Sequence, residues 1–159
     1  MTQRTQSAII VALVVILDRL TKLWIVAKVS AFSVIPVIPG FFNIVHAENP
    51  GAAFSMLADA PPQWRGIVLI GISTVVMVFI AALLWRPLDS RWMRISLPLV
   101  FGGALGNLLD RIFRGTVTDF LQVFLGRYEY PSFNVADSAI SIGACLLVLD
   151  LLRSRKSGS

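Results

Sequence analysis

Long apolar runs separated by polar stretches dominate the pattern along the chain. Residues 66–85 contain no charged residue, and residues 134–152 are mostly apolar, with an aspartate near each end. Each run is long enough to cross a bilayer as a helix, which takes about 20 mostly apolar residues. A third run, 95–109, is uncharged but short, so its polar flanks must lie close to the membrane. We expect that helix to span 95–111.

The first apolar run, 7–29, is interrupted by Asp18, Arg19 and Lys22. Its start resembles a cleavable signal peptide, but apolar residues continue after Lys22 and no small-residue cleavage site follows directly. We therefore interpret this run as a retained helix. The predicted fold is a mainly α polytopic membrane protein with four transmembrane helices, at about 7–29, 66–85, 95–111 and 134–152.

Composition favours a single membrane-embedded domain covering residues 1–159. Hydrophobic residues make up 56% of the chain and charged residues 14%, whereas a typical soluble domain is about 25% charged. The chain is too short for two ordinary domains. The net charge of +5 does not indicate a nucleic-acid partner, because the basic residues form no continuous stripe and lie mostly beside hydrophobic runs.

The distribution of Lys and Arg predicts the orientation. Four helices place both termini and the 86–94 loop on one side, and that side is denser in Lys and Arg than segments 30–65 and 112–133. By the positive-inside rule both termini are cytoplasmic. The two longer segments are then extracytoplasmic. Within them, 41–45 and 116–123 resemble short strands, which predicts a small β-sheet at the outer surface.

Polar residues on three of the predicted helices share one depth, near the outer surface. Residues three or four apart lie on one helix face. Such pairs are Asp18 and Lys22, Asn107 and Arg111, and Asn134 and Asp137, and Asp119 lies in the outer segment nearby. Ionisable groups in a membrane are costly and usually face the protein interior with a partner. Structural roles stay open for the first two pairs, as an ion pair and as a brace for the outer segment.

Asp119 and Asp137 carry the strongest chemical hypothesis. Each lies in a mostly apolar stretch, and two adjacent carboxyls there would share one proton, because both cannot ionise cheaply. Such a pair suits hydrolysis, since the ionised member takes a proton from water and the protonated member polarises a carbonyl. The chain has one His and one Cys and no cluster with metal-ligand spacing, so we expect no metal site.

Five sequence blocks, in this order, resemble those of the lipoprotein signal peptidase (signal peptidase II) family. They are DRLTK at 18–22, NPGAAFS at 49–55, GNLLDR at 106–111, GTVTDF at 115–120 and FNVAD at 133–137. Together they cover nearly the whole chain. Arg19 stands where the family commonly has Gln, a difference that leaves Asp119 and Asp137 unchanged.

The resemblance implies an aspartic endopeptidase of the bacterial inner membrane, with its active site near the periplasmic face. Such enzymes cut the signal peptide from prolipoproteins just before a cysteine that carries diacylglycerol. The resemblance assigns catalysis to Asp119 and Asp137. The residues that match positions shaping or supporting the site are Asn49, Gly51, Asn107, Arg111, Asn134, Asp18 and Lys22.

The resemblance also implies water as the nucleophile, no metal and no cofactor. The expected partners are diacylglyceryl-prolipoprotein substrates and membrane lipid, with no nucleic acid, and the expected state is a monomer. The fold implied has a small outer β-sheet and a mobile outer segment, about 51–64, over the cleft.

Two other functions compete with the peptidase hypothesis. A small ion or proton transporter subunit would need charged groups spread across the membrane depth. The 66–85 run has none, and the 134–152 run has them only near its ends. A noncatalytic membrane assembly factor would use the outer segment to bind a partner and would tolerate Asp119→Asn and Asp137→Asn.

Overall fold

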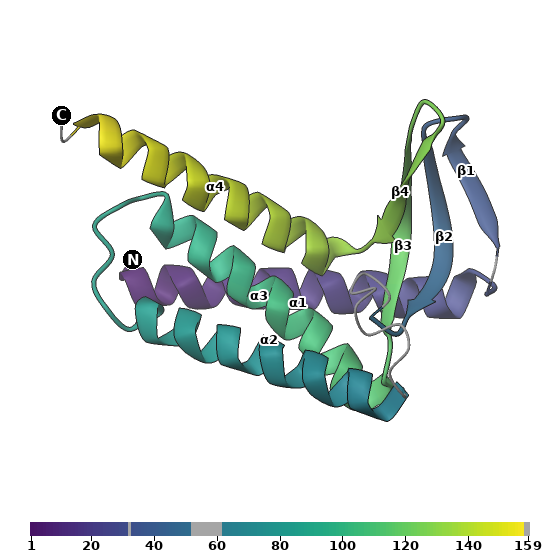
Figure 1. The fold of residues 1–159 in the computed structure, drawn as a ribbon, viewed down its shortest axis with the longest axis horizontal. Helices are drawn as coiled ribbons and strands as arrows, with labels where there is room; N and C mark the ends of the chain where they lie inside the picture. Colours follow the sequence, from purple (N-terminus) through teal and green to yellow (C-terminus); the bar gives the residue numbers. More distant parts are fainter. Residues whose placement is uncertain (32, 52–61, 158–159) are drawn as a thin grey trace.

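The computed structural model describes residues 1–31, 33–51 and 62–157. Within these ranges, four helices lie side by side and a four-stranded sheet stands at one end of them (Figure 1). In chain order the elements are α1 (Gln3–Lys28), β1 (Val34–Ile38), β2 (Phe42–Asn49), α2 (Pro62–Leu84), α3 (Met93–Arg114), β3 (Val117–Leu125), β4 (Tyr128–Phe133) and α4 (Val135–Ser157). The start of α1 and the end of α4 lie at the end remote from the sheet (Figure 1).

Helix α3 is central among the helices and packs against α1, α2 and α4. Glycines on α3 permit this, because a side chain at these positions would meet a neighbouring helix. A Cβ on Gly102 would lie 3.0 Å from Cβ of Val14, and one on Gly106 would lie 2.7 Å from Oδ2 of Asp18. Small residues four apart are typical of close helix packing in membranes. The close approach brings the polar residues of α1 against those of α3.

The sheet is antiparallel in the order β1-β2-β3-β4, so β2 and β3 are its central strands. Gly115 ends α3 with φ 76°, in the left-handed region that glycine adopts readily. The chain then turns directly into β3. The register pairs Ala47 with Asp119 and Asn49 with Val117. Asp119 therefore lies in a central strand, close to the end of α3.

The predicted strands 41–45 and 116–123 correspond to β2 and β3, which confirms a small sheet. Strands β1 and β4 were not predicted. They lie at the two edges of the sheet, and each contains a proline, Pro36 or Pro131. Proline is tolerated in edge strands because its missing N–H need not pair there, but it weakens the strand signal in the sequence.

The helices extend beyond most of the predicted limits. The structure gives 3–28, 62–84, 93–114 and 135–157, where the sequence predicted 7–29, 66–85, 95–111 and 134–152. The apolar run marks only the part of a helix that lipid covers, whereas the helix continues into polar flanks. Most of the segment 51–64, expected over the cleft, falls outside the described residues.

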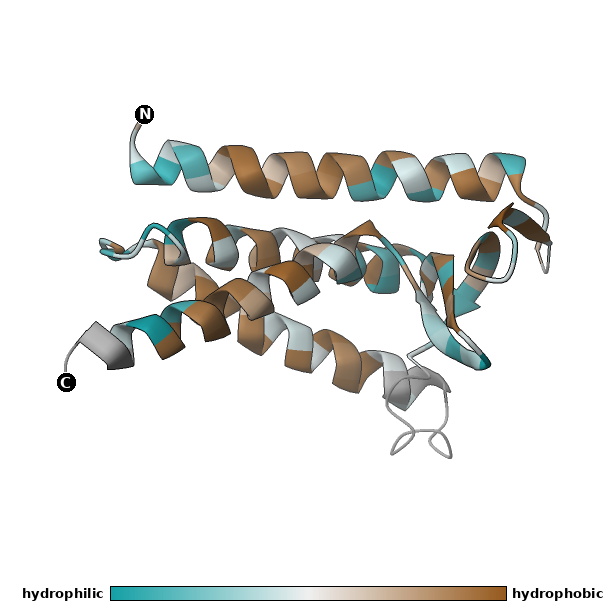
Figure 2. Ribbon diagram, turned by 90° about the horizontal axis from the view of Figure 1, so that it is seen from above, coloured by the Kyte–Doolittle hydropathy of each residue, from teal (hydrophilic) through white to brown (hydrophobic). Residues whose placement is uncertain are grey.

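Three helical stretches among the described residues are long and apolar enough to cross a membrane, namely Gly66–Leu84, Met93–Arg114 and Val135–Ser154. Hydrophobic residues occupy much of the length of the helices (Figure 2). Large apolar side chains such as Leu20 on α1 and Phe79 on α2 are exposed. Apolar surface of this extent is typical of contact with lipid. Helix α1 is not among the three, because charged residues interrupt its apolar sequence.

We expect Gly103→Ala to destabilise the protein. A Cβ on Gly103 would meet the carbonyl oxygen of Ala136 and lie 2.8 Å from Cγ1 of Ile140, both in α4. Overpacking of this kind costs about 1–3 kcal/mol, so the melting temperature in detergent should fall. The matched control is Gly71→Ala in α2, where a Cβ meets nothing within 4 Å and alanine is the better helix former. Equal melting temperatures for both variants would contradict this account of α3–α4 packing.

Candidate active site

Asp119 and Asp137 open onto one cavity where the helices meet the sheet. The cavity has a volume of about 750 Å³. Asp119 lies on β3 and Asp137 in the first turn of α4. The same cavity is lined by Asn49, Gly51 and Arg111. The structure therefore brings residues such as Asn49 and Asp137, which lie more than 80 positions apart in the sequence, to the same cavity.

The start of α4 positions Asp137 by a local device. Oδ1 of Asn134 accepts a hydrogen bond from the backbone N–H of Asp137 at 2.9 Å, and Oδ2 of Asp137 accepts from the N–H of Asn134 at 3.3 Å. This reciprocal arrangement is a capping box, which satisfies two backbone donors that a helix start leaves free. The start of its own helix thus holds Asp137 through Oδ2, and its other oxygen, Oδ1, can accept from another element.

Three asparagine side chains donate to the two aspartates. Nδ2 of Asn49 reaches Oδ2 of Asp119 at 2.8 Å, and Nδ2 of Asn134 reaches its Oδ1 at 2.7 Å. Nδ2 of Asn107 reaches Oδ1 of Asp137 at 2.7 Å. Donors of this kind stabilise the charged form of a buried carboxyl. All three asparagines predicted from the sequence therefore contact the aspartate pair.

Gly51 determines which end of the Asn49 amide faces Asp119. Its backbone N–H donates to Oδ1 of Asn49 at 2.8 Å, so the NH₂ group of Asn49 is left for Asp119. Gly51 has φ 97°, a backbone conformation that favours glycine. A residue with a side chain would be strained there, and the turn that orients Asn49 would be disturbed.

Burial raises the pKa of Asp119 from its ordinary value of 3.8 to about 6. Its side chain is almost completely withdrawn from solvent, and a low-dielectric environment disfavours the charged form. The hydrogen bonds from Asn49 and Asn134 oppose this effect, and the nearby Asp137 charge adds to it. Near neutral pH the proton is therefore held more strongly at Asp119 than at an ordinary aspartate.

Arg111 brings a positive charge to the cavity. It follows Asn107 by one helical turn on α3, and its Nη1 lies 3.4 Å from the carbonyl oxygen of Asn107. The carboxyls of Asp119 and Asp137 both act electrostatically on its guanidinium group. A cation beside two carboxyls offsets negative charge that would otherwise be costly in this setting.

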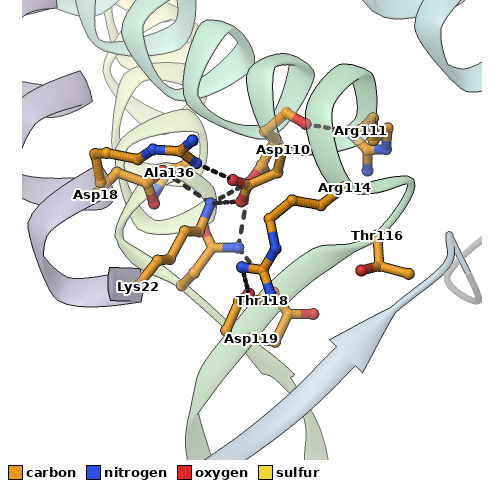
Figure 3. A network of polar contacts seen from close by, with 12 residues as sticks. Asp18, Lys22, Asp110, Arg111, Arg114, Thr116, Thr118, Asp119 and Ala136 are labelled. Atoms are coloured by element: carbon orange, nitrogen blue, oxygen red, sulfur yellow. Dashed lines mark hydrogen bonds and ion pairs between the residues drawn. The ribbon is translucent and has the colours of Figure 1, made fainter. Parts of the chain in front are cut away.

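Behind the site, α1 and α3 share a buried charge cluster (Figure 3). We use this name for Asp18, Arg19, Lys22 and Asp110. Nζ of Lys22 lies 2.8 Å from Oδ2 of Asp18 and 2.8 Å from Oδ2 of Asp110, and Arg19 bonds Oδ1 of Asp110 at 2.6 Å. Oδ1 of Asp18 also accepts from the backbone N–H of Ala136 at 3.0 Å. The cluster thus connects α1, α3 and the start of α4.

Asp110 and Arg19 are members of this cluster that the sequence did not identify as site residues. Asp110 is 0% exposed, whereas the Arg19 side chain is 39% exposed at its edge. Arg19, which stands where the family commonly has Gln, is a direct partner of Asp110. The sequence did mark Asp110 as unusual, because it is a carboxylate beside an apolar run. Residue spacing along the chain, however, does not predict which residue of another helix pairs with it.

Glu48 joins β2 to the end of α3. It accepts hydrogen bonds from Arg114 at 2.9 Å, Thr116 at 2.6 Å and Thr118 at 3.2 Å. Partial burial raises the pKa of Glu48, but the hydrogen bonds from Thr116 and from His46 and the Arg114 charge outweigh it, so the pKa lies below its usual value. This connection, which the sequence did not reveal, fixes the neighbouring Asn49 beside β3.

Among the described residues, no group of three His, Cys, Asp or Glu side chains comes together as a metal site would require. The acidic residues nearest the site are instead paired with Arg, Lys or asparagine donors.

Known proteins resemble this chain in sequence and in fold. The sequence model of the signal peptidase II family matches residues 10–153. The chain belongs to the signal peptidase II family. It is 46% identical to the lipoprotein signal peptidase of Solibacter usitatus, covering 94% of this chain and 92% of the relative. It is 44% identical to that of Pseudomonas aeruginosa strain UCBPP-PA14, covering 94% and 89%.

Solved structures extend the likeness to three dimensions. A bacterial membrane enzyme superposes with a TM-score of 0.84 at 31% identity, covering 96% of this chain and 91% of that one. A second bacterial membrane enzyme gives a TM-score of 0.81 at 32% identity, covering 92% of each chain. Together with the three long apolar helices, this likeness shows that the chain is a multi-pass membrane protein.

Substitutions at Asn134 should separate helix capping from the contact with Asp119. Asn134→Ala removes both functions, and loss of an N-cap costs about 0.5–2 kcal/mol. Asn134→Ser keeps an oxygen that caps α4 but removes the NH₂ donor to Asp119. We therefore expect Asn134→Ala to lower the melting temperature in detergent and Asn134→Ser to recover much of that loss. If the serine variant is as unstable as the alanine variant, the capping role of Asn134 is minor.

Proposed function

We propose that this member of the signal peptidase II family is an aspartic endopeptidase of the bacterial inner membrane. It removes the signal peptide from diacylglyceryl-modified prolipoproteins by cutting just before the lipidated cysteine. The observation that supports this most is the pair of carboxyls on one cavity, Asp119 and Asp137, each held by asparagine donors. The family relationship supports the substrate, since the relatives are named lipoprotein signal peptidases.

In the proposed mechanism Asp137 is the base and Asp119 the acid. The Asp137 carboxylate takes a proton from water, and the water oxygen forms a bond to the carbonyl carbon of the scissile peptide. Asp119 donates its proton to the carbonyl oxygen, which gives a tetrahedral diol. When the C–N bond breaks, Asp137 returns its proton to the departing amine and Asp119 regains its own. The raised pKa of Asp119 supports this assignment.

Arg111 and the three asparagines complete the site. Asn49, Asn107 and Asn134 hold the aspartate oxygens in fixed positions, and Arg111 offsets charge on the pair. Electrostatic groups that are already oriented need no rearrangement during reaction, which is a major source of catalysis. The chemistry requires only carboxyls and water, so we propose a reaction that is independent of metals and cofactors.

The substrate is anchored in lipid, and the surroundings of Asp137 suit such a chain. An apolar groove of about 460 Å³ adjoins Asp137 and is lined by residues that include Val123, Leu125, Phe133 and Ile142. We assign this groove to apolar parts of the substrate beside the scissile bond. A lipid-held peptide then reaches the aspartates without leaving the membrane surface.

We propose four membrane spans, with α1 as the fourth. Helix α1 has 26 residues, about 39 Å at the usual helical rise and thus longer than the hydrocarbon core of about 30 Å. Its charged residues Asp18 and Lys22 are 1% exposed and face the protein interior, whereas Leu20 and Leu23 face outward. We further propose that both termini are cytoplasmic and that the sheet is periplasmic. In this proposal residues 1–159 form one domain, and the enzyme acts as a monomer.

Replacing either aspartate should abolish cleavage while leaving the protein folded. We expect Asp119→Asn and Asp137→Asn each to slow cleavage at least about 100-fold, because each removes an acid or base that acts in the transition state. The assay is cleavage of a diacylglyceryl-modified prolipoprotein by purified enzyme in detergent containing EDTA. Asp89→Asn, at an exposed loop position, is the matched control.

Cleavage by the wild type and by Asp89→Asn, but not by the two site variants, is the expected outcome. Substantial turnover by either site variant would overturn the assignment and favour a noncatalytic role. Loss of wild-type activity in EDTA that zinc restores would contradict the metal-independent mechanism.

The pH dependence follows from the proton on Asp119. Its pKa is raised to about 6, so the protonated acid is present below that pH and is lost as the pH rises through it. We expect kcat/KM, which reports the free enzyme, to fall about tenfold per pH unit above this value. Melting temperatures across the same range check that the protein stays folded. A profile that stays level or rises above that pKa would show that Asp119 is not the acid.

A further inference from the structure

Lys22 contacts the site although it lies on α1, behind the aspartate pair. Its Nζ is 3.0 Å from Oδ1 of Asn107, and Nδ2 of the same amide donates to Asp137 at 2.7 Å. Lys22 is 1% exposed, so no solvent competes for its ammonium group. One asparagine side chain thus separates a buried cation from a carboxyl of the proposed catalytic pair.

The chemistry of the ammonium group fixes which way the Asn107 amide points. A lysine ammonium has three N–H donors and no acceptor. Only the oxygen of the amide can therefore face Lys22, and the NH₂ group must face the opposite side, where Asp137 lies. A second donor, Nδ2 of Asn134, lies 3.2 Å from the same oxygen and favours the same orientation.

Lys22 differs from the groups that orient the other two site amides. Asn49 is oriented by the backbone N–H of Gly51, and Asn134 by the backbone N–H of Asp137. Those donors belong to the chain itself. The amide of Asn107, by contrast, is oriented by side chains from outside α3, with Lys22 giving the shorter contact and Asn134 the longer one.

The buried charge cluster explains how Lys22 keeps its position and its charge. Asp18 and Asp110 each contact Nζ at 2.8 Å. Arg19 contacts Asp110 from the other side, so the two acids and two bases balance. A buried ammonium group is stable only when it is paired in this way. The cluster thus supplies a rigid, charged donor aimed at Asn107.

We propose that Lys22 is a positioning residue of the reaction, which acts through Asn107 to keep an N–H donor on Asp137. This inference rests on the proposed peptidase function. Lys22 itself touches neither substrate nor aspartate pair. Its effect is to exclude the flipped Asn107 amide, which would turn a carbonyl oxygen toward Asp137 and favour protonation of the base.

Loss of Lys22 should therefore lower kcat with little change in KM, and should move the acidic limb of the pH profile to higher pH. Other charged groups also act near Asp137, namely Arg111 on α3, Asp119 on β3, and Asp18 and Asp110 around Lys22. Removing the Lys22 charge acts on the pair through space as well. The test must separate that direct effect from the effect through Asn107.

A double-mutant cycle makes this separation. Lys22→Met is combined with Asp110→Asn, because the pair of changes keeps the charge balance of the cluster and an amide oxygen for Arg19. The four proteins are Asp110→Asn alone, and the same protein with Lys22→Met, with Asn107→Ala, or with both. Single-turnover cleavage of the lipidated substrate at saturating enzyme is measured from about pH 5 to about pH 8. Melting temperatures show which variants are folded.

If Lys22 acts through Asn107, Lys22→Met slows cleavage at least about tenfold when Asn107 is present and less than about threefold in the Asn107→Ala background. The shift of the acidic limb should likewise require Asn107. Equal effects in both backgrounds would mean that Lys22 only supports the fold or acts through space, and no effect in either would also overturn the proposal. If Asp110→Asn prevents folding, the same cycle is run without it.

Wild-type enzyme and Asp119→Asn are measured alongside. Cleavage by the former and not the latter establishes the peptidase function independently of Lys22. A failed cycle in an active enzyme then refutes the positioning role alone, whereas an inactive wild type refutes the proposed function.

Discussion

The structure depends on one constraint, which is that charges withdrawn from water must be paired. Asp18, Lys22 and Asp110 are each 1% exposed or less, and an unpaired buried charge costs several kcal/mol or more. Their pairing across α1 and α3 therefore permits few relative positions of these helices. The bond from Asp18 to the backbone of Ala136 extends the same constraint to α4. The helices are thus joined by the groups that would be most costly to leave apart.

The glycines of α3 make this pairing sterically accessible. Gly106 packs directly against the Asp18 carboxyl, and Gly103 packs against the backbone of α4 at Ala136. Larger residues would hold the helices apart and lengthen the ionic contacts. Close packing and charge pairing therefore depend on each other. The absence of a side chain at Gly106 lets α1 come close enough to α3 for the ion pairs of the buried charge cluster to form.

The two aspartates reach a common cavity by different routes. Asp137 is held by a capping box within its own helix, whereas Asp119 depends on the register of β3 in the sheet and on the turn at Gly115. The two side chains come together only because the helices and the sheet meet at this point. Because Glu48 ties β2 to that junction, the position of Asn49 depends on it as well.

The sequence by itself determined what hydropathy and short spacing control. It located the apolar core of each helix, the face shared by Asp18 and Lys22, and the proximity of Asn134 to Asp137, because these relations follow from helical geometry within one element. The motif order identified the family. Tertiary structure alone decided that Asp119 and Asp137 share a cavity, that Lys22 also binds Asp110 and Asn107, and that β1 and β4 complete the sheet. These contacts join separate elements, and their geometry is set by packing and strand register, which the spacing of residues along a chain does not encode.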